Sequence, residues 1–155
     1  MGVATLSVKG RALRYLAQRE HSRAELERKL ARHVQDGDEA SAQAQIALAL
    51  DQLAAAGLLS DARAADAVLS SQGRKFGTRR LKQVLQSKGL DAELVGTTLQ
   101  QARATELDRA REVWRRRFGA PATDAPERAR QMRFLAGRGF DGDVIRRVVQ
   151  GRDDD

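Results

Sequence analysis

Apolar residues recur along this chain at intervals of three and four, the spacing of an amphipathic helix. No segment sustains the alternation of apolar and polar residues that marks a half-buried strand. The pattern predicts an all-α fold of about nine short helices. Their apolar stripes are Ala12, Leu13 and Leu16; Leu26 and Leu30; Ile46, Leu50 and Leu53; Val68 and Leu69; Leu81, Val84 and Leu85; Leu94, Val95 and Leu99; Leu107, Ala110, Val113, Trp114 and Phe118; Met132 and Leu135; and Val144, Ile145, Val148 and Val149.

Residues that favour helix ends stand at the borders of these stripes. Ser22 followed by Glu25 predicts a capping box, in which the side chain of each residue accepts a hydrogen bond from the backbone N–H group of the other. Glycines that follow a stripe predict left-handed helix stops. The other predicted signals are a second box at Asp124 and Glu127, N-caps at Ser60 or Asp61, at Asp91 and at Asp141, and stops at Gly57, Gly89 and Gly139.

Part of the sequence is repeated. Residues 80–99, with KGLDAELV at their centre, superimpose on residues 130–149, with RGFDGDVI at theirs, and a weaker match relates residues 26–30 to residues 81–85. Such units gain stability by stacking on their neighbours, which predicts an elongated, curved body. A single nine-helix bundle is the alternative. The predicted organisation is three tandem three-helix repeats, at 6–59, 60–103 and 104–151, followed by an acidic tail at 152–155.

The charge is positive and unevenly distributed. The 155 residues include 28 Lys and Arg against 21 Asp and Glu, a net charge of +7. Residues 9–51 carry eight basic and seven acidic side chains, whereas residues 61–103 carry eight against four and residues 106–147 eleven against seven. An excess of this kind favours a polyanion or an acidic protein surface as partner. The low aromatic share of 4% predicts several small cores.

Candidate chemistry is sparse. The chain has no cysteine, which excludes disulfides and thiolate ligands, and His21 and His33 lie too far apart to suggest a zinc site. His21 is expected to pack against Leu26 beside the cap. No phosphate-binding glycine loop occurs. Residues 1–10 lack the apolar stretch of a signal peptide, and no run is long enough to cross a membrane. We expect a cytoplasmic protein with no cofactor, no metal and no catalytic residues.

Several segments resemble the RecX family of recombinase regulators. The most specific is ALRYLAQREHSRAELERKL at residues 12–30. The resemblance continues through LAAAGLLSDARAADAVL at residues 53–69 and RRLKQVLQSKGLDAELV at residues 79–95. It ends with RAREVWRRRFG from residue 109 and RQMRFLAGRGFDGDVIRRVV from residue 130. Together these segments cover nearly the whole chain in the family's order.

This resemblance implies a function. A member of the family is expected to lodge in the groove of the RecA–DNA filament, to contact more than one RecA subunit, and to suppress ATP hydrolysis, coprotease activity and strand exchange. We expect a monomer whose partner is the RecA filament, with sequence-independent contact to single- or double-stranded DNA. The residues themselves leave two alternatives open, a general nucleic-acid-binding helical protein without a filament partner and a helical scaffold without any polyanion contact.

Basic residues of the last two-thirds of the chain are the candidate binding face for RecA or DNA. Arg79 with Lys82, and Arg130 with Arg133, are spaced to share one side of a helix. Cations at 115–117 also suit the negative end of a helix dipole. The whole predicted set is Arg74, Lys75, Arg79, Arg80, Lys82, Lys88, Arg115, Arg116, Arg117, Arg130, Arg133, Arg138, Arg146 and Arg147.

Overall fold

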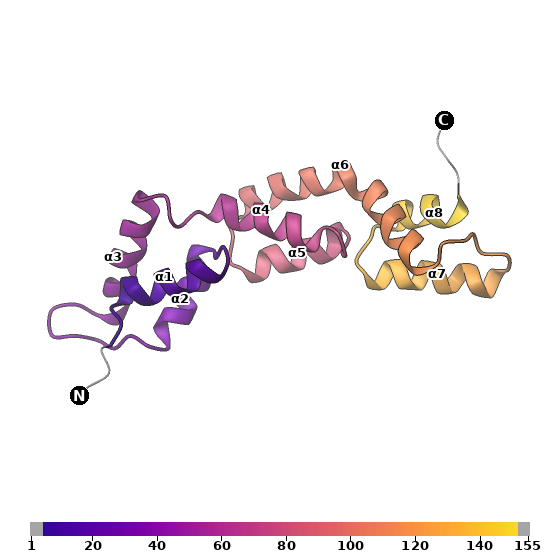
Figure 1. The fold of residues 1–155 in the computed structure, drawn as a ribbon. Helices are drawn as coiled ribbons and strands as arrows, with labels where there is room; N and C mark the ends of the chain where they lie inside the picture. The colour runs from indigo at the N-terminus through magenta and orange to yellow at the C-terminus, as the bar shows by residue number, and fades with distance from the viewer. Residues whose placement is uncertain (1–4, 152–155) are drawn as a thin grey trace. The chain divides into compact units, whose positions relative to one another are not determined.

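The structure, a computed structural model, describes residues 5–151. These residues form eight α-helices and no β-strand, which confirms the all-α prediction (Figure 1). No helix within them is both long and apolar enough to span a bilayer. The predicted acidic tail lies outside the described residues. The helices are α1 (Val8–Gln18), α2 (Arg23–Ala31), α3 (Ala42–Ala55), α4 (Asp61–Gln72), α5 (Thr78–Ser87), α6 (Ala92–Arg117), α7 (Ala125–Gly137) and α8 (Gly142–Gln150).

Helix α6 corrects the predicted number of helices from nine to eight within the described part of the chain. The two helices expected around residues 94–99 and 107–118 are one helix of 26 residues. The connecting residues 100–106, QQARATE, contain no glycine or proline and consist largely of good helix formers, so nothing ends the helix there. The limit drawn between Arg103 and Ala104 therefore falls inside a continuous helix, and the limits of the three repeats stay a prediction.

The helices pack as two units. The first contains the residues up to Ala65 together with Lys88–Leu90. Within it α1 packs on α2 and α3, and α2 packs on α3. The apolar stripes of the three helices face one another and form one core. This core is small because each helix contributes only a few large side chains. The buried core residues are Ala12, Leu26, Leu30, Ile46, Leu50, Leu53 and Leu59.

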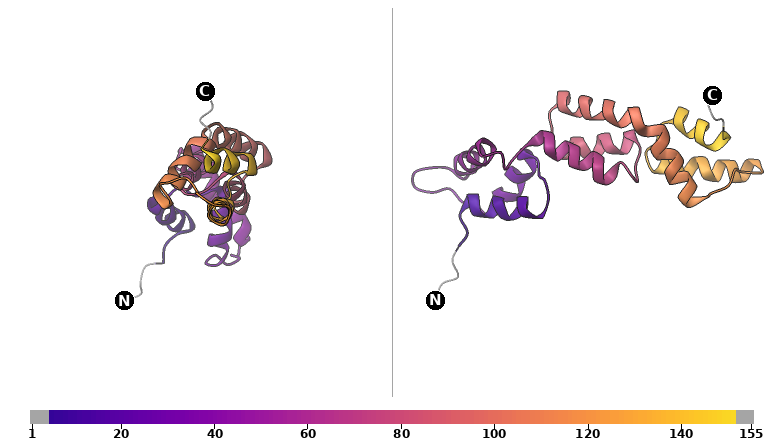
Figure 2. Two further views of the ribbon diagram at one scale, coloured as in Figure 1. Left: turned by 90° about the vertical axis from the view of Figure 1, so that its right-hand side faces the viewer. Right: turned by 45° about the horizontal axis from the view of Figure 1, so that its top comes forward.

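The second unit contains Asp66–Ser87 and the residues from Asp91 onward. Its helices α6, α7 and α8 pack on one another, and the right-hand view of Figure 2 shows the orange end of α6 beside the light-orange and yellow helices α7 and α8. They enclose a core of Ala110, Val113, Leu135, Phe140, Ile145, Val148 and Val149. Helix α5 packs along α6. The buried side chains that meet there, with those of α4, are Val68, Leu81, Leu85, Leu99 and Ala102. Several small cores thus take the place of one large one.

Most of the predicted helix ends are confirmed. Ser22 and Glu25 form both hydrogen bonds of a capping box at the start of α2. The side chain of Asp91 accepts a hydrogen bond from the Leu94 N–H group at 2.8 Å. At α4 the Ser60 hydroxyl accepts from the backbone at 3.2 Å. The predicted stops at Gly57, Gly89 and Gly139 have φ angles of 76°, 68° and 85°, which are left-handed and favour glycine.

Two predicted caps differ from expectation. Asp141 stands at the N-cap of α8, but its side chain makes no capping hydrogen bond. Its carboxylate instead lies 3.2 Å from the guanidinium of Arg79. Asp124 caps α7 through the Glu127 N–H group at 2.8 Å, while the Glu127 carboxylate forms an ion pair with Arg130 at 2.9 Å. Both departures have one cause, because an arginine within reach competes with the backbone N–H group for a carboxylate.

Candidate functional site

Three segments of the second unit bring basic side chains together around one groove. The loop between α4 and α5 supplies Arg74 and Lys75, the last turns of α6 supply Arg116 and Arg117, and the C-cap of α7 supplies Arg138. The groove has a volume of about 340 Å³, and Val113 and Phe134 complete its lining. None of these seven residues is acidic. We call this site the basic groove.

A second hollow adjoins the basic groove and shares Arg74 and Arg116 with it. Its volume is also about 340 Å³, but its other lining residues are Asp108, Arg109 and Glu112. The mixture of signs lowers the local potential, since each carboxylate offsets one cation. Of the two hollows, the basic groove is the stronger candidate for an anion.

Aromatic rings hold two of the groove arginines. The guanidinium carbon of Arg138 lies 5.1 Å from the ring centre of Phe134 and 5.8 Å from that of Phe76. The corresponding atom of Arg117 lies 5.5 Å from Phe134 and 5.6 Å from Phe118. Contacts of this kind contribute about 0.5–1 kcal/mol each at exposed positions and restrict the side chain. The two cations are therefore partly ordered before any ligand arrives.

The remaining predicted residues do not line the basic groove. Several carry an ion pair with a neighbouring carboxylate, Arg79 with Asp141, Arg115 with Glu112, Arg130 with Glu127 and Arg146 with Asp143. These pairs are solvent-exposed and contribute about 0–1 kcal/mol each, so a partner could displace them at little cost. Arg80, Lys82, Arg133 and Arg147 also lie outside the groove in this unit, and all four are exposed.

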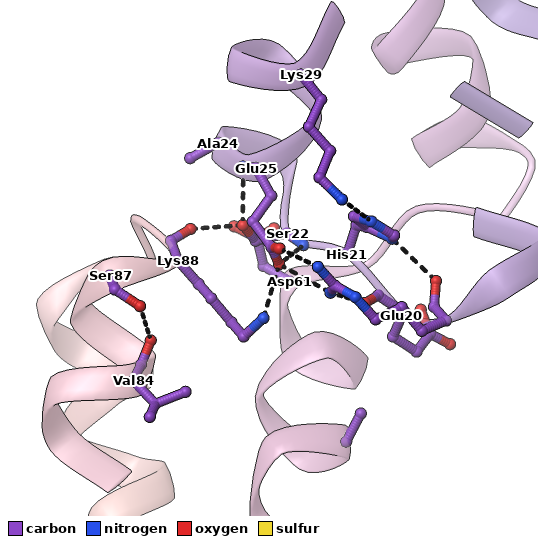
Figure 3. Close-up of polar contacts among 12 residues, drawn as sticks. Glu20, His21, Ser22, Ala24, Glu25, Lys29, Asp61, Val84, Ser87 and Lys88 are labelled. Carbon is purple, nitrogen blue, oxygen red and sulfur yellow. Dashed lines mark hydrogen bonds and ion pairs between the residues drawn. The ribbon is translucent and has the colours of Figure 1, made fainter. Parts of the chain in front are cut away.

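Lys88 lies apart from the set, in the first unit. Only 16% of its side chain is exposed, and its ammonium lies 3.2 Å from the Glu25 carboxylate. Its backbone carbonyl accepts a hydrogen bond from the Ser22 hydroxyl (Figure 3). These contacts account for Lys88 as a residue that holds the Lys88–Leu90 loop against the start of α2.

Arg109 fixes the loop that carries Arg74 and Lys75, a role that no pattern in the sequence indicates. Its guanidinium donates to the carbonyl oxygens of Gly73 at 2.8 Å, Phe76 at 2.7 Å and Ala102 at 2.8 Å. Burial lowers the pKa of Arg109, and the charge of Glu106 acts in the opposite direction. The two hydrogen bonds to Gly73 and Phe76, from one charged donor, make this loop a defined structure at the edge of the basic groove.

Glu106 was also missed. It is buried, at 4% exposure, and its Oε1 atom accepts the N–H groups of Thr78 and Asp141, both at 3.1 Å. Thr78 is the first residue of α5 and Asp141 the N-cap of α8, so one carboxylate serves two helix N-termini. In the sequence Glu106 is only an acidic residue between apolar positions of a helix. That pattern usually indicates a side chain that faces solvent, so it does not single out a buried carboxylate.

The first unit has a comparable polar cluster around Glu25 (Figure 3). The Glu25 carboxylate accepts from the Arg19 guanidinium at 2.7 Å, the Lys88 ammonium at 3.2 Å and the Ser22 N–H group at 3.1 Å. Burial alone would raise the pKa of Glu25, but these donors outweigh it and lower the pKa from 4.5 to about 2. The cluster ties α2 to the loop that precedes α6.

His21 stands beside this cluster, fully buried. One ring nitrogen lies 3.0 Å from the Arg19 carbonyl oxygen, and the other lies 2.9 Å from the Lys29 ammonium (Figure 3). A neutral ring that donates through Nδ1 and accepts through Nε2 satisfies both contacts. Burial lowers the pKa of His21, consistent with that neutral form. The neighbours of His21 give it a structural role in the polar cluster.

The stability of the first unit is expected to fall with acid because of Glu25. A pKa lowered to about 2 in the folded state means that the carboxylate stabilises the fold above pH 4.5 and that this contribution is lost between pH 4.5 and 2. Glu25→Gln should therefore be clearly less stable than the parent at pH 7, and the difference should shrink toward pH 3. Urea unfolding followed by circular dichroism at both pH values measures this. A difference independent of pH would contradict the assignment.

Known proteins with similar sequences identify the chain's family. Models of the RecX family match it twice, as "RecX, first three-helix domain" over residues 9–41 and "RecX, third three-helix domain" over residues 104–149. The "Regulatory protein RecX" of Leptothrix cholodnii is 53% identical over 94% of this chain and 88% of its own length. That of Ralstonia nicotianae is 45% identical over 96% and 89%.

A solved structure supports the fold. The crystal structure of RecX from Lactobacillus salivarius matches with a TM-score of 0.72 and covers 93% of each chain, at 19% sequence identity. The all-helical architecture is therefore shared even where the sequences have diverged. The sequence matches, which extend over nearly the full length at high identity, carry the assignment, and the chain belongs to the RecX family.

Proposed function

We propose that this chain binds the RecA–DNA filament and lowers RecA's ATP hydrolysis, coprotease activity and strand exchange. Its membership in a family of regulatory proteins supports a regulatory role. The observation that carries the proposal is the basic groove, where five cations from three segments face one opening without an acidic neighbour in the lining. Such a surface attracts a polyanionic assembly, and a filament of recombinase on DNA is one. The protein acts as a monomer in the cytoplasm.

The proposed mechanism is a steric clamp. A body of three helical repeats, at residues 6–59, 60–103 and 104–151, bridges neighbouring RecA subunits. A bridging protein obstructs the entry of duplex DNA and opposes the subunit motions that accompany ATP turnover. The lining of the basic groove fits a binding role, since its Arg and Lys side chains can attract and orient an anion.

The ATPase activity of the cognate RecA on single-stranded DNA tests the proposal. We expect this chain to inhibit it at a ratio of one protein per RecA or below. Arg74, Lys75 and Arg117 of the basic groove, changed together to Glu, should raise the concentration for half-inhibition on the order of tenfold, because cations that face the polyanionic partner are replaced by anions. Helical circular dichroism should be unchanged, since all three side chains are exposed.

The matched control makes the same change of charge in the first unit. Lys9, Arg14 and Arg32 are also exposed, and their joint replacement by Glu should leave inhibition within about twofold of the parent. An inactive parent protein would discard the filament proposal. An equal loss of inhibition in both variants would show that net charge, and not the basic groove, determines inhibition.

A further inference from the structure

The cations of the basic groove are largely unneutralised. Within residues 5–151, Arg74, Lys75, Arg117 and Arg138 form no ion pair with a carboxylate, and of the five groove cations only Arg116 does, with Glu112 at 3.1 Å. By contrast, most other arginines of the predicted face have an acidic partner. Like charges gathered at one place destabilise the folded state, so the arrangement is favourable only when an anion is bound.

The shape and chemistry of the groove restrict that anion. Four of the five cations are arginines, whose planar guanidinium donates two parallel hydrogen bonds to an oxyanion. Val113 and Phe134 give the groove an apolar floor, which weakens the screening of charges by water. A volume of about 340 Å³ is large enough for neighbouring phosphoryl groups.

We propose that the basic groove binds two or more neighbouring phosphoryl groups. The ligand is a phosphate chain, either the backbone of a nucleic-acid strand or a free polyphosphate. The inference deepens the proposed function and rests on it for its setting, since it assigns to the second unit a contact with phosphate groups, distinct from any contact with RecA itself. Acidic protein surfaces are the competing class of partner, and the experiment separates them.

The structure also explains how the groove is held ready. Arg109 fixes the backbone on both sides of Arg74 and Lys75 through the Gly73 and Phe76 carbonyl oxygens. Arg138 lies over two aromatic rings on the other side. Order that exists before binding lowers the entropy that a ligand must offset. The backbone that carries Arg74 and Lys75 and the guanidinium of Arg138 are thus partly ordered before a phosphate chain binds.

Binding of a fluorescent oligonucleotide, dT20, in the absence of RecA tests the groove. We expect the Arg74→Ala, Lys75→Ala double variant to bind roughly 25-fold more weakly in 0.1 M salt. Each lost contact with single-stranded DNA removes about 0.7 from the slope of log affinity against log salt, so the slope should fall by about 1.4. The control, Lys82→Ala with Arg133→Ala, removes the same charge from exposed positions outside the groove and should change affinity by less than about fourfold.

Tripolyphosphate, added as a competitor, distinguishes the two sources of phosphate. Displacement of dT20 at micromolar tripolyphosphate supports a free polyphosphate as ligand, and displacement only at millimolar concentration supports a nucleic-acid strand. Equal dT20 affinities of the groove variant and the control would overturn the proposal. So would a groove variant that binds dT20 normally but no longer inhibits RecA, because the groove would then contact protein. A parent that binds dT20 through the groove but never inhibits RecA would refute the filament function and leave the groove assignment intact.

Discussion

Gly77→Ala is expected to destabilise the second unit by about 3 kcal/mol, which is large for the addition of one methyl group. A Cβ atom at Gly77 would lie 2.3 Å from the Phe140 Cα atom and 2.4 Å from the Phe140 nitrogen. Both are backbone atoms, so no side-chain rotation can relieve the overlap. The Gly77 N–H group also donates to the Arg138 carbonyl oxygen at 2.9 Å. A shift large enough to admit the methyl group would therefore break that hydrogen bond as well.

Gly96→Ala is the matched control, because it adds the same methyl group to the same unit. Gly96 lies in α6, and a Cβ atom there would meet nothing within 4 Å. Replacing a glycine inside a helix by alanine stabilises by roughly 0.5–1 kcal/mol. Urea unfolding of both variants should thus move the midpoint in opposite directions. Similar midpoints for Gly77→Ala and the parent would mean that the two loops do not approach each other as closely as the structure places them.

The close approach at Gly77 also bears on the basic groove. Gly77 follows the loop that carries Arg74 and Lys75, and its partner across the contact is the loop that carries Arg138. A second backbone hydrogen bond, from the Arg79 N–H group to the Gly139 carbonyl oxygen at 3.0 Å, joins the same two segments. The packing of glycine against backbone therefore sets the distance between cations on opposite sides of the groove.

The local structure of the chain was predictable from the sequence because local interactions determine it. Ser22 with Glu25, and Asp91 before its helix, act through hydrogen bonds to residues three positions away. The continuity of the helix through residues 100–106 was predictable in principle from the helix propensities of those residues. The separate apolar stripes on either side were instead interpreted as two helices. Periodicity reports which face of a helix is buried and says little about where the helix ends.

The sequence could predict which cations belong to a positive face, but not that they meet in the basic groove. Charge counting identified Arg74, Arg116 and Arg138 as members of a positive face, but their distances depend on how α6 and α7 pack against the loop after α4. Lys88 shows that charge and repeat position can also select a residue that lies elsewhere. It matches Arg138 in the sequence repeat and yet pairs with Glu25 in the first unit. Equivalent positions in two repeats can therefore serve different purposes.

One kind of contact occurs in both units, but the sequence did not reveal it because the residues that form it lie far apart along the chain. The Asp61 carboxylate accepts the N–H group of Arg23, the first residue of α2, at 2.8 Å. The Glu106 carboxylate accepts the N–H group of Thr78, the first residue of α5, at 3.1 Å. The same task is done in each unit by an acidic residue from a later helix. Asp61 stands four residues before the buried Ala65, and Glu106 stands four residues before the buried Ala110, so the two acids hold corresponding positions in the sequence.

Glu106→Ala is the second substitution for which we expect a large loss, about 3 kcal/mol in the free energy of unfolding. It leaves the N–H groups of Thr78 and Asp141 without their acceptor, and an unsatisfied buried donor costs about 1–3 kcal/mol. It also removes a negative charge from the N-termini of α5 and α8, where the helix dipoles favour one. Arg109 loses the negative charge that offsets its burial.

Glu106→Gln separates these effects. Both N–H groups bind the same oxygen, Oε1, and a glutamine offers an oxygen in that place, so the hydrogen bonds can persist while the charge is lost. The glutamine variant should therefore lose only about 1 kcal/mol, the difference between charged and neutral acceptors. Urea unfolding gives both values, and amide hydrogen exchange at Thr78 and Asp141 should accelerate in the alanine variant alone. Equal losses in the two variants would show that the charge, and not the shared acceptor, holds α5 and α8 together.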